Sequence, residues 1–267
     1  MKHLIVIDLD DTLLTTDKKI TDLNKTVIDK LKELGHIIVL ATGRAFHGTI
    51  PYYEELDLNT IVITDNGAFI SNPSDENFKD LRTTIPSETF TKMFDTLKHT
   101  IATGVINQNS ISYGYNYNAG FDNSFNGIPP QKAIEADFYN LGFEPMNLDV
   151  AVYRDHQEKF ESYFKNHPTL DARFWSADED YGYYDIHLKS VNKAEAVKTA
   201  MKFYNLNKDQ VITFGDGVND TELLALTPNG TAMKNASSIT KKYANNITEF
   251  DNNDSGVGRH LIKFFNL

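Results

Sequence analysis

The chain of 267 residues carries 26 Lys and Arg against 37 Asp and Glu, a formal net charge of −11 at pH 7. This acidic balance disfavours nucleic-acid partners and anionic membranes, since both are bound by basic surfaces. The sequence has no cysteine, which excludes disulfides, thiolate metal sites and cysteine nucleophiles. This composition fits a protein of the reducing cytoplasm. We expect a monomer or small homo-oligomer.

The first third of the chain alternates strand-like and helix-like patterns. Its opening run, Leu4–Ile7, is continuously apolar, as in a central parallel strand, and is too short for a secretory signal or a membrane span. Apolar residues then recur at helical spacing from Ile20 to Leu34, and Gly35 ends this predicted helix. The next predicted elements are strands at residues 37–41 and 60–64 and a tight turn at 66–67.

The middle of the chain, residues 83–187, differs in composition. It holds 7 of the 26 Lys and Arg, 15 of the 37 Asp and Glu and 19 of the 31 aromatic residues, so its net charge is −8. Strands are predicted at residues 111–117, 149–153 and 183–188, and helices near 87–99, 131–141 and 157–166. We interpret this segment as an inserted α/β domain between core segments 1–82 and 188–267; a single larger domain is the alternative.

The last third resumes the alternation of strands and helices. Its predicted elements are a helix at residues 193–204, a strand at 210–214, a helix at 220–226, a turn at 229–230 before a short strand, and a closing helix at 257–265. Strands that alternate with helices imply a parallel sheet with right-handed crossovers, so the predicted fold class is α/β.

Two carboxylates follow the first predicted strand, in Asp8-Leu9-Asp10-Asp11-Thr12. In extended backbone the side chains of Asp8 and Asp10 point to the same side, and their repulsion requires a cation or a shared proton. A bound cation and a shared proton both suit phosphoryl transfer. Asp8 would then be the nucleophile, and Asp10 the acid that protonates the leaving group and then activates water. Taken alone, the pair is explained at least as well by acids clustering in a loop.

Two further motifs supply anion-binding groups. Thr42-Gly43-Arg44 follows the second strand, where a hydroxyl and free amides form a small anion site; a helix N-cap at Thr42 is the alternative. Lys193 stands near the start of a helix, where a cation opposes the macrodipole. A nearby phosphate would compensate for that position, although a solvated lysine explains it better when the residue is taken alone.

The most specific fragment is Gly215-Asp216-Gly217-Val218-Asn219-Asp220, which follows an apolar strand. Asp216 and Asp220 are hard oxygen ligands suited to Mg²⁺, and Asn219 can donate to a phosphate oxygen. A glycine-rich turn with a capping acid is the alternative. Because open parallel sheets assemble ligand sites at the carboxyl ends of their strands, we expect these motifs to converge there.

In this order the motifs resemble those of the haloacid dehalogenase (HAD) superfamily, specifically its Cof-type phosphatases with an α/β (type IIB) cap. The resemblance covers essentially the whole chain and includes the turn Asp65-Asn66-Gly67-Ala68. It implies a Rossmann-like core, an inserted cap domain that sets substrate specificity, and Mg²⁺-dependent hydrolysis of phosphomonoesters through an aspartyl-phosphate. The chain departs from the family pattern at Asp11, Ala194 and Lys234, where glycine is common, and at Ser255, where an acid is frequent.

The resemblance assigns the site residues to three sets. The catalytic residues are Asp8 and Asp10. The metal ligands are Asp8, Asp10 through its carbonyl, Asp216 and, in or next to the outer shell, Asp220. The phosphate contacts are the Leu9 amide, Thr42, Gly43, Lys193 and Asn219.

We therefore predict a Mg²⁺-dependent phosphatase for small phosphorylated metabolites, with sugar phosphates favoured. One alternative is a phosphomutase or phosphotransferase that uses the same intermediate, and another is a non-catalytic protein that binds a phosphorylated metabolite. Aromatic residues of the inserted domain can stack on a sugar or flavin ring, although most of them are expected to form its core. The candidates for stacking are Tyr113, Tyr115, Tyr117, Trp175 and Tyr183.

Overall fold

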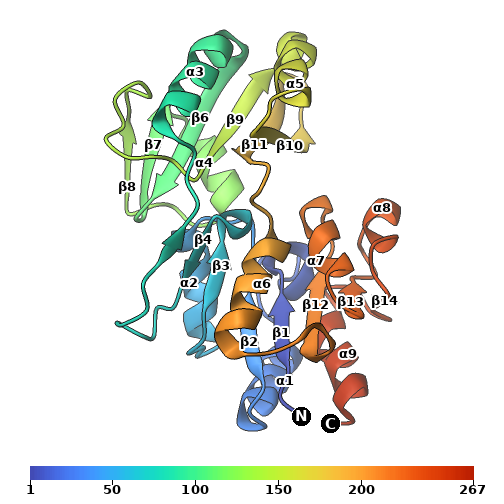
Figure 1. Cartoon of the computed structure of the whole chain (residues 1–267). Coiled ribbons are helices and arrows are strands. Elements are labelled where there is room, and N and C mark those ends of the chain that lie inside the picture. Colours follow the sequence, from blue (N-terminus) through green and yellow to red (C-terminus); the bar gives the residue numbers. More distant parts are fainter. The chain divides into compact units, whose positions relative to one another are not determined.

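The computed structural model describes residues 1–122 and 127–267 and separates into two compact units (Figure 1). We call them the core unit and the inserted unit. The core unit comprises Met1–Gly43, Thr49–Leu81 and Asn192–Leu267. The inserted unit comprises Arg44–Gly48 and Arg82–Val191. No helix in the described part of the chain combines the length and apolar character needed to cross a bilayer.

A parallel sheet in the order β14-β13-β12-β1-β2 forms the centre of the core unit. Its strands are β1 (Leu4–Ile7), β2 (Ile37–Leu40), β12 (Val211–Gly215), β13 (Asn229–Ala232) and β14 (Asn246–Ile247). The helices of this unit are α1 (Asp22–Glu33), α6 (Lys193–Tyr204), α7 (Thr221–Ala225), α8 (Ser238–Lys241), α9 (Gly256–Phe265) and most of α2 (Phe46–Glu55). The predicted α/β class with a Rossmann-like parallel-sheet core is confirmed.

Strand β1 lies inside this sheet, between β12 and β2, and is apolar throughout. All of its residues are fully buried, and each such side chain contributes about 1.5–3 kcal/mol by leaving water. Helix α6 covers one face of the sheet, where its Val197 and Ala200 belong to the same hydrophobic cluster as Val6 and Val39 (Figure 1). Continuous apolar runs therefore become strands that are buried on both faces.

A small sheet in the order β3-β4-β5 completes the core unit. Its strands are β3 (Val62–Thr64), β4 (Phe69–Ser71) and β5 (Leu81–Arg82). β3 contacts the parallel sheet through an Ala41–Ile63 bridge, and it pairs antiparallel with β4 across the turn Asp65–Gly67. Asn66 adopts φ 53° in this turn, a left-handed conformation that asparagine tolerates better than most residues.

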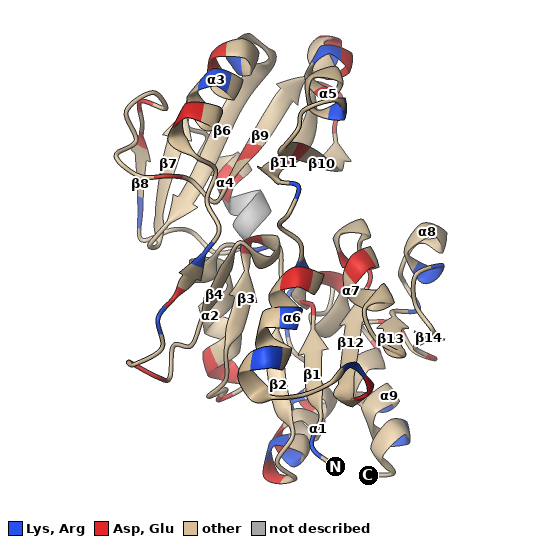
Figure 2. Cartoon of the chain, viewed as in Figure 1, with Lys and Arg blue, Asp and Glu red and all other residues tan. Residues whose placement is uncertain are grey.

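The inserted unit is built on a mixed sheet in the order β10-β11-β9-β6-β7-β8. Its strands are β6 (Ile101–Gln108), β7 (Ile111–Tyr115), β8 (Lys132–Glu135), β9 (Asn147–Tyr153), β10 (Leu170–Ala177) and β11 (Tyr181–Leu188). Its helices are α3 (Ser87–Leu97), α4 (Ala119–Asn126) and α5 (Gln157–Lys165). Charged residues of both signs mark α3 and α5, whose apolar sides pack on the sheet (Figure 2).

The structure corrects two sequence expectations. Residues 131–141 were expected to be helical, but β8 lies there and pairs parallel with β7. The Gln131 amide donates to the Ser110 carbonyl before β7, and the Ala136 amide donates to the Gly114 carbonyl in β7, so strand pairing overrides the local helical preference. The expected turn at Asn229-Gly230 is instead the start of β13.

Candidate active site

The site is assembled where β1 and β12 end side by side. The two strands pair in parallel with Ile7 opposite Phe214, so their carboxyl ends coincide. Asp8 follows Ile7 directly, and its amide donates to the Phe214 carbonyl at 3.1 Å. Asp216 follows the last residue of β12. The strand register thus brings together carboxylates that lie more than 200 residues apart in the chain.

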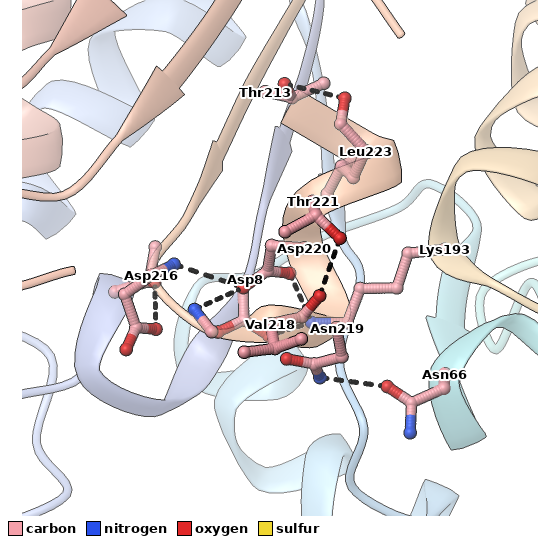
Figure 3. Close-up of polar contacts among 12 residues, drawn as sticks. Asp8, Asn66, Lys193, Thr213, Asp216, Val218, Asn219, Asp220, Thr221 and Leu223 are labelled. Carbon is pink, nitrogen blue, oxygen red and sulfur yellow. Dashed lines mark hydrogen bonds and ion pairs between the residues drawn. The ribbon is translucent and has the colours of Figure 1, made fainter. Parts of the chain in front are cut away.

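Three carboxylates converge at this point. One oxygen from each of Asp8, Asp216 and Asp220 lies within 4.8 Å of the other two. Asp8 and Asp220 are buried, and Asp216 is partly buried. Figure 3 shows their side chains together at the ends of the strands. Hard carboxylate oxygens at this separation are donors that suit Mg²⁺, so the residues fit a divalent cation.

Lys193 is the positive charge of the cluster. Its side chain is fully buried, and its Nζ donates to Asp8 Oδ1 at 2.6 Å and to Asp220 Oδ1 at 2.7 Å. Lys193 is the first residue of α6, which Asn192 caps by accepting from the Glu195 amide at 2.9 Å. The sequence suggested that a phosphate offsets this unfavourable helix position, and in the structure two carboxylates contact the ammonium group.

The protonation balance of the cluster reflects an excess of buried negative charge. Burial raises the pKa of Asp8 well above its ordinary value; Lys193 opposes this shift, and Asp220 and Asp216 add to it. Burial and then the charge of Asp220 raise the pKa of Asp216 to about 7. Burial alone would lower the pKa of Lys193, but Asp220 and Asp8 hold it above its usual value. A divalent cation would therefore stabilise the ionised carboxylates.

The loop after β12 positions Asp220 through its backbone. Asp220 Oδ2 accepts hydrogen bonds from the amides of Asp216 at 3.1 Å and Gly217 at 3.0 Å. A Cβ at Gly215 would lie 2.4 Å from the Asp220 carboxyl carbon, so this position requires glycine. Gly215 and Gly217 thus allow the backbone to lie close to the Asp220 carboxylate.

A group of polar residues lies at the end of β2 and in the turn after β3. Thr42 is buried, and its amide donates to the Ile63 carbonyl at 3.0 Å. Asn219 Nδ2 donates to Asn66 Oδ1 at 2.9 Å (Figure 3). A Cβ at Gly43 would lie 3.1 Å from that oxygen and 3.5 Å from Asn219 Nδ2. The structure therefore brings Gly43, Asn66 and Asn219 together.

The sequence of this chain matches a known protein family. Residues 5–261 match the model of the haloacid dehalogenase-like hydrolase family. The chain belongs to this family.

Relatives of similar length support the assignment. The 5-amino-6-(5-phospho-D-ribitylamino)uracil phosphatase YitU of Bacillus subtilis is 28% identical, over 99% of this chain and 98% of its own. The phosphatase YwpJ of the same organism is 24% identical, over 97% of this chain and 98% of its own. The predicted family and the predicted enzyme class, a HAD-type phosphatase, are confirmed.

Solved structures share the fold. A haloacid dehalogenase-like hydrolase from Bacteroides thetaiotaomicron superposes with a TM-score of 0.85 at 21% identity, covering 99% of this chain and 100% of its own. The HAD subclass IIB sugar phosphatase BT4131 superposes with a TM-score of 0.80 at 18% identity, covering 100% of this chain and 99% of its own. The parallel-sheet core with a separate mixed-sheet unit is thus a known HAD architecture.

The remaining predicted residues of this HAD phosphatase lie in the turn after β1. Leu9 is fully buried at the start of a π-helical turn (Leu9–Leu13), in which the Leu14 amide donates to the Leu9 carbonyl at 2.9 Å. The Asp10 side chain is 38% exposed and accepts from Lys18 Nζ at 2.8 Å. Its carboxylate therefore reaches solvent, and the buried carboxylate cluster is formed by Asp8, Asp216 and Asp220.

Sequence patterns did not single out two residues of the site. Thr12 is fully buried, and its Oγ1 donates to Asp216 Oδ1 at 2.9 Å, which fixes the orientation of that carboxylate. Asn66 contacts Asn219, as described above. Both residues lay inside segments that resemble HAD motifs, so the only available signal was that resemblance.

The departure from the family pattern at Asp11 has a conformational meaning. Asp11 adopts φ 52°, the left-handed region in which glycine is unstrained. The glycine common at this position in HAD proteins fits this backbone, and aspartate is among the residues that tolerate it. Ser255, the other departure with a positive φ of 59°, contacts Thr21 through their hydroxyl oxygens at 2.7 Å.

Proposed function

We propose that this HAD phosphatase hydrolyses small phosphorylated metabolites with Mg²⁺ as its cofactor and an aspartyl-phosphate at Asp8 as its intermediate. One observation carries the proposal. The Asp8 carboxylate is buried at the tip of β1, bonded to Lys193 and grouped with the carboxylates of Asp216 and Asp220. A nucleophilic carboxylate needs such fixed positive charge to approach an anionic phosphoryl group.

The first chemical step is the attack of an Asp8 carboxylate oxygen on phosphorus, which breaks the bond between phosphorus and the ester oxygen. Lys193 orients Asp8 through the 2.6 Å hydrogen bond and opposes the rise in the pKa of Asp8 that burial causes. Asp10 donates a proton to the leaving oxygen; the exposed side chain of Asp10 allows it to exchange protons with solvent. Asp10 then accepts a proton from the water that attacks phosphorus and releases Asp8.

The metal would be held by Asp8, the Asp10 carbonyl and Asp216, with Asp220 in or next to the outer shell. Bound there, Mg²⁺ would neutralise charge on the phosphoryl oxygens and orient the group for in-line attack. Thr12 holds Asp216 through its 2.9 Å hydrogen bond, so the proposed metal ligand is oriented before the cation binds.

Phosphate binding is proposed for the Leu9 amide, Thr42, Gly43, Lys193 and Asn219. The contacts among Gly43, Asn66 and Asn219 support this set, because they fix the Asn219 amide beside a backbone with no side chain. Such a backbone allows a phosphate to approach closely. The Lys193 ammonium supplies the positive charge of the set.

The proposed substrate class rests on the substrates for which similar proteins are named. Sugar phosphates are favoured, because the similar structure BT4131 is a subclass IIB sugar phosphatase. The relative YitU is named for another small phosphorylated metabolite, a phosphorylated ribitylaminouracil. We propose that the inserted unit serves as the specificity cap. Transfer of the phosphoryl group to a hydroxyl of a second metabolite, as in a mutase, is the alternative outcome of the same intermediate.

The decisive experiment replaces Asp8 by Asn. The change keeps the shape of the side chain and removes its nucleophilic oxygen, so we expect phosphate release from a panel of sugar phosphates to fall by at least about a thousandfold. The matched control is Asp11→Asn on the same turn, where asparagine also tolerates the left-handed backbone; we expect a change of less than about threefold.

The fate of the phosphoryl group separates a phosphatase from a mutase or phosphotransferase. Hydrolysis in ¹⁸O-labelled water puts the label into inorganic phosphate, whereas a mutase or phosphotransferase leaves it in water and phosphorylates the acceptor. Turnover that survives in Asp8→Asn would refute the nucleophile assignment. An unmodified protein with no magnesium-dependent phosphate release across the panel would favour a metabolite-binding role.

A further inference from the structure

The turn between β3 and β4, Asp65–Gly67, has an unusual backbone. Its three residues have φ angles of 52°, 53° and 102°, all in the left-handed region. Glycine adopts such angles freely, whereas aspartate and asparagine adopt them at a cost in free energy. Asp65 and Asn66 are also buried, with 3% and 5% of their surface exposed. Backbone strain of this kind persists only where the surrounding structure enforces it, and it is concentrated at functional sites.

The backbone of the turn is bonded to the end of β2. The Asn66 amide donates to the Thr42 carbonyl at 3.0 Å, and the Thr42 amide donates to the Ile63 carbonyl at 3.0 Å. These hydrogen bonds continue the pairing of Ala41 with Ile63 beyond the end of β2. They hold Thr42, one of the proposed phosphate contacts, against the turn.

The side chain of Asn66 contacts Gly43 and Asn219. A Cβ at Gly43 would lie 3.1 Å from Asn66 Oδ1 and 3.2 Å from Asn66 Nδ2, so this amide packs against the Gly43 backbone. Asn66 Oδ1 accepts from Asn219 Nδ2 at 2.9 Å (Figure 3). Because an oxygen faces Asn219, the Asn219 amide turns its nitrogen toward Asn66.

The bond to Asn66 leaves a donor on Asn219. A side-chain amide nitrogen carries two hydrogens, and Asn66 Oδ1 accepts one of them. The second hydrogen has no partner among the residues that the structure describes. Asn219 is therefore held in an orientation that can donate to a phosphate oxygen.

Gly67 brings the turn against the start of α6. A Cβ at Gly67 would lie 2.5 Å from the Asn192 carbonyl oxygen and 3.2 Å from Ala196 Cβ. The absence of a side chain at Gly67 therefore permits this approach. Asn192 is the N-cap of α6, and Lys193 is its first residue. The turn thus packs against the residue that directly precedes the ammonium group of the site.

One short turn therefore contacts three segments that are distant along the chain. These are the end of β2, the start of α6 and the loop after β12. The turn and all three segments belong to the core unit. Donors from separate segments bind one phosphate well only when their relative positions are fixed closely. The turn is placed to fix them.

We propose that Asn66 is a positioning residue of the phosphate site, which holds the Asn219 amide in the orientation that donates to phosphate. The turn Asp65–Gly67 also keeps Thr42 and Lys193 in place around the same group. Asn66 acts through Asn219, so its effect on phosphate binding depends on the Asn219 side chain. This inference rests on the proposed function, from which the set of phosphate contacts comes.

A double-mutant cycle tests the coupling between Asn66 and Asn219. Asn66→Gly removes the side chain, and glycine keeps the left-handed backbone without strain. The Kd of inorganic phosphate is measured by isothermal titration calorimetry on the full chain with saturating Mg²⁺. We expect Asn66→Gly to raise this Kd about threefold to thirtyfold. In the Asn219→Ala background, the same substitution should raise it by less than about twofold.

The matched control is Asn205→Gly. Asn205 has the same φ of 53° and is exposed at the C-cap of α6, at the opposite end of this helix from Lys193. The control repeats the change from asparagine to glycine in a left-handed backbone away from the phosphate contacts. We expect the Kd of phosphate to stay within about twofold of the unmodified value.

Circular dichroism checks that each variant is folded. If Asn66→Gly does not fold, Asn66→Ser takes its place in the cycle. Serine adopts the left-handed backbone elsewhere in this chain, at Ser110 and Ser255, and its hydroxyl is too short to replace the amide oxygen that Asn219 contacts.

The outcomes separate this inference from the proposed function. If the unmodified chain binds phosphate and loss of the Asn66 side chain leaves the Kd unchanged, the positioning role of Asn66 is overturned alone. An equal loss of affinity with and without the Asn219 side chain would also overturn it, because Asn66 would then act as a general structural residue. An unmodified chain that binds no phosphate in the presence of Mg²⁺ would refute the proposed phosphate site and this inference together.

Discussion

Replacing Lys193 by Met tests the electrostatics on which the site depends. Methionine keeps a chain of similar length and removes the ammonium group, so Asp8 and Asp220 lose hydrogen bonds of 2.6 and 2.7 Å. Removing one partner from a buried ion pair costs about 3–5 kcal/mol, because the remaining charge stays buried without compensation. We expect a loss of this size in the free energy of unfolding at pH 8 in the presence of EDTA.

The loss should respond to protons and to magnesium. Burial already raises the pKa of Asp8, and without Lys193 this carboxyl takes up a proton more readily. A carboxyl with a raised folded-state pKa destabilises the fold as pH rises, so the penalty should be smaller at pH 5 than at pH 8. A divalent cation bound at about 100 times its Kd would restore about 2.7 kcal/mol.

The assay is urea unfolding monitored by circular dichroism, with EDTA or with saturating Mg²⁺. The matched control is Lys198→Met on the same helix, because Lys198 pairs with Glu195 at the surface with 44% of its side chain exposed. Surface pairs of this kind contribute about 0–1 kcal/mol. A loss below about 1 kcal/mol for Lys193→Met in EDTA at pH 8 would refute the burial of the ammonium group between two carboxylates.

Two other predictions concern the metal and the phosphate. Because the pKa of Asp216 is raised to about 7, protons compete with the cation, and calorimetry should show Mg²⁺ affinity rising from pH 6 to pH 8; a flat profile would exclude this carboxyl as a ligand. In Gly43→Ala the new methyl group would lie 3.1 Å from Asn66 Oδ1, so we expect KM for a sugar phosphate to rise about threefold to thirtyfold with the melting temperature nearly unchanged. An unchanged KM would remove Gly43 from the phosphate site.

Parallel strands make the location of the site predictable from local patterns. The apolar runs at β1, β2 and β12 each end in a polar motif, and parallel strands must present their carboxyl ends at one edge of the sheet. The same patterns predicted α6 from Lys193 to Tyr204, as the structure has it. Asp8, Asp216 and Asp220 therefore meet for a reason that a single sequence already contains.

The sequence by itself determined most strands and helices of the core unit and where the reactive carboxylates stand along them, because hydrophobic periodicity and breakers are local. It did not determine β8, where the local pattern predicted a helix. Only the tertiary structure decided the contacts of Asn66 with Asn219 and of Thr12 with Asp216, which join residues 153 and 204 positions apart. It also decided that Tyr115 packs against the core of the inserted unit while Trp175, the extra residue of a bulge in strand pairing, keeps 40% of its surface exposed. Register between strands is set by long-range packing, which local periodicity does not encode.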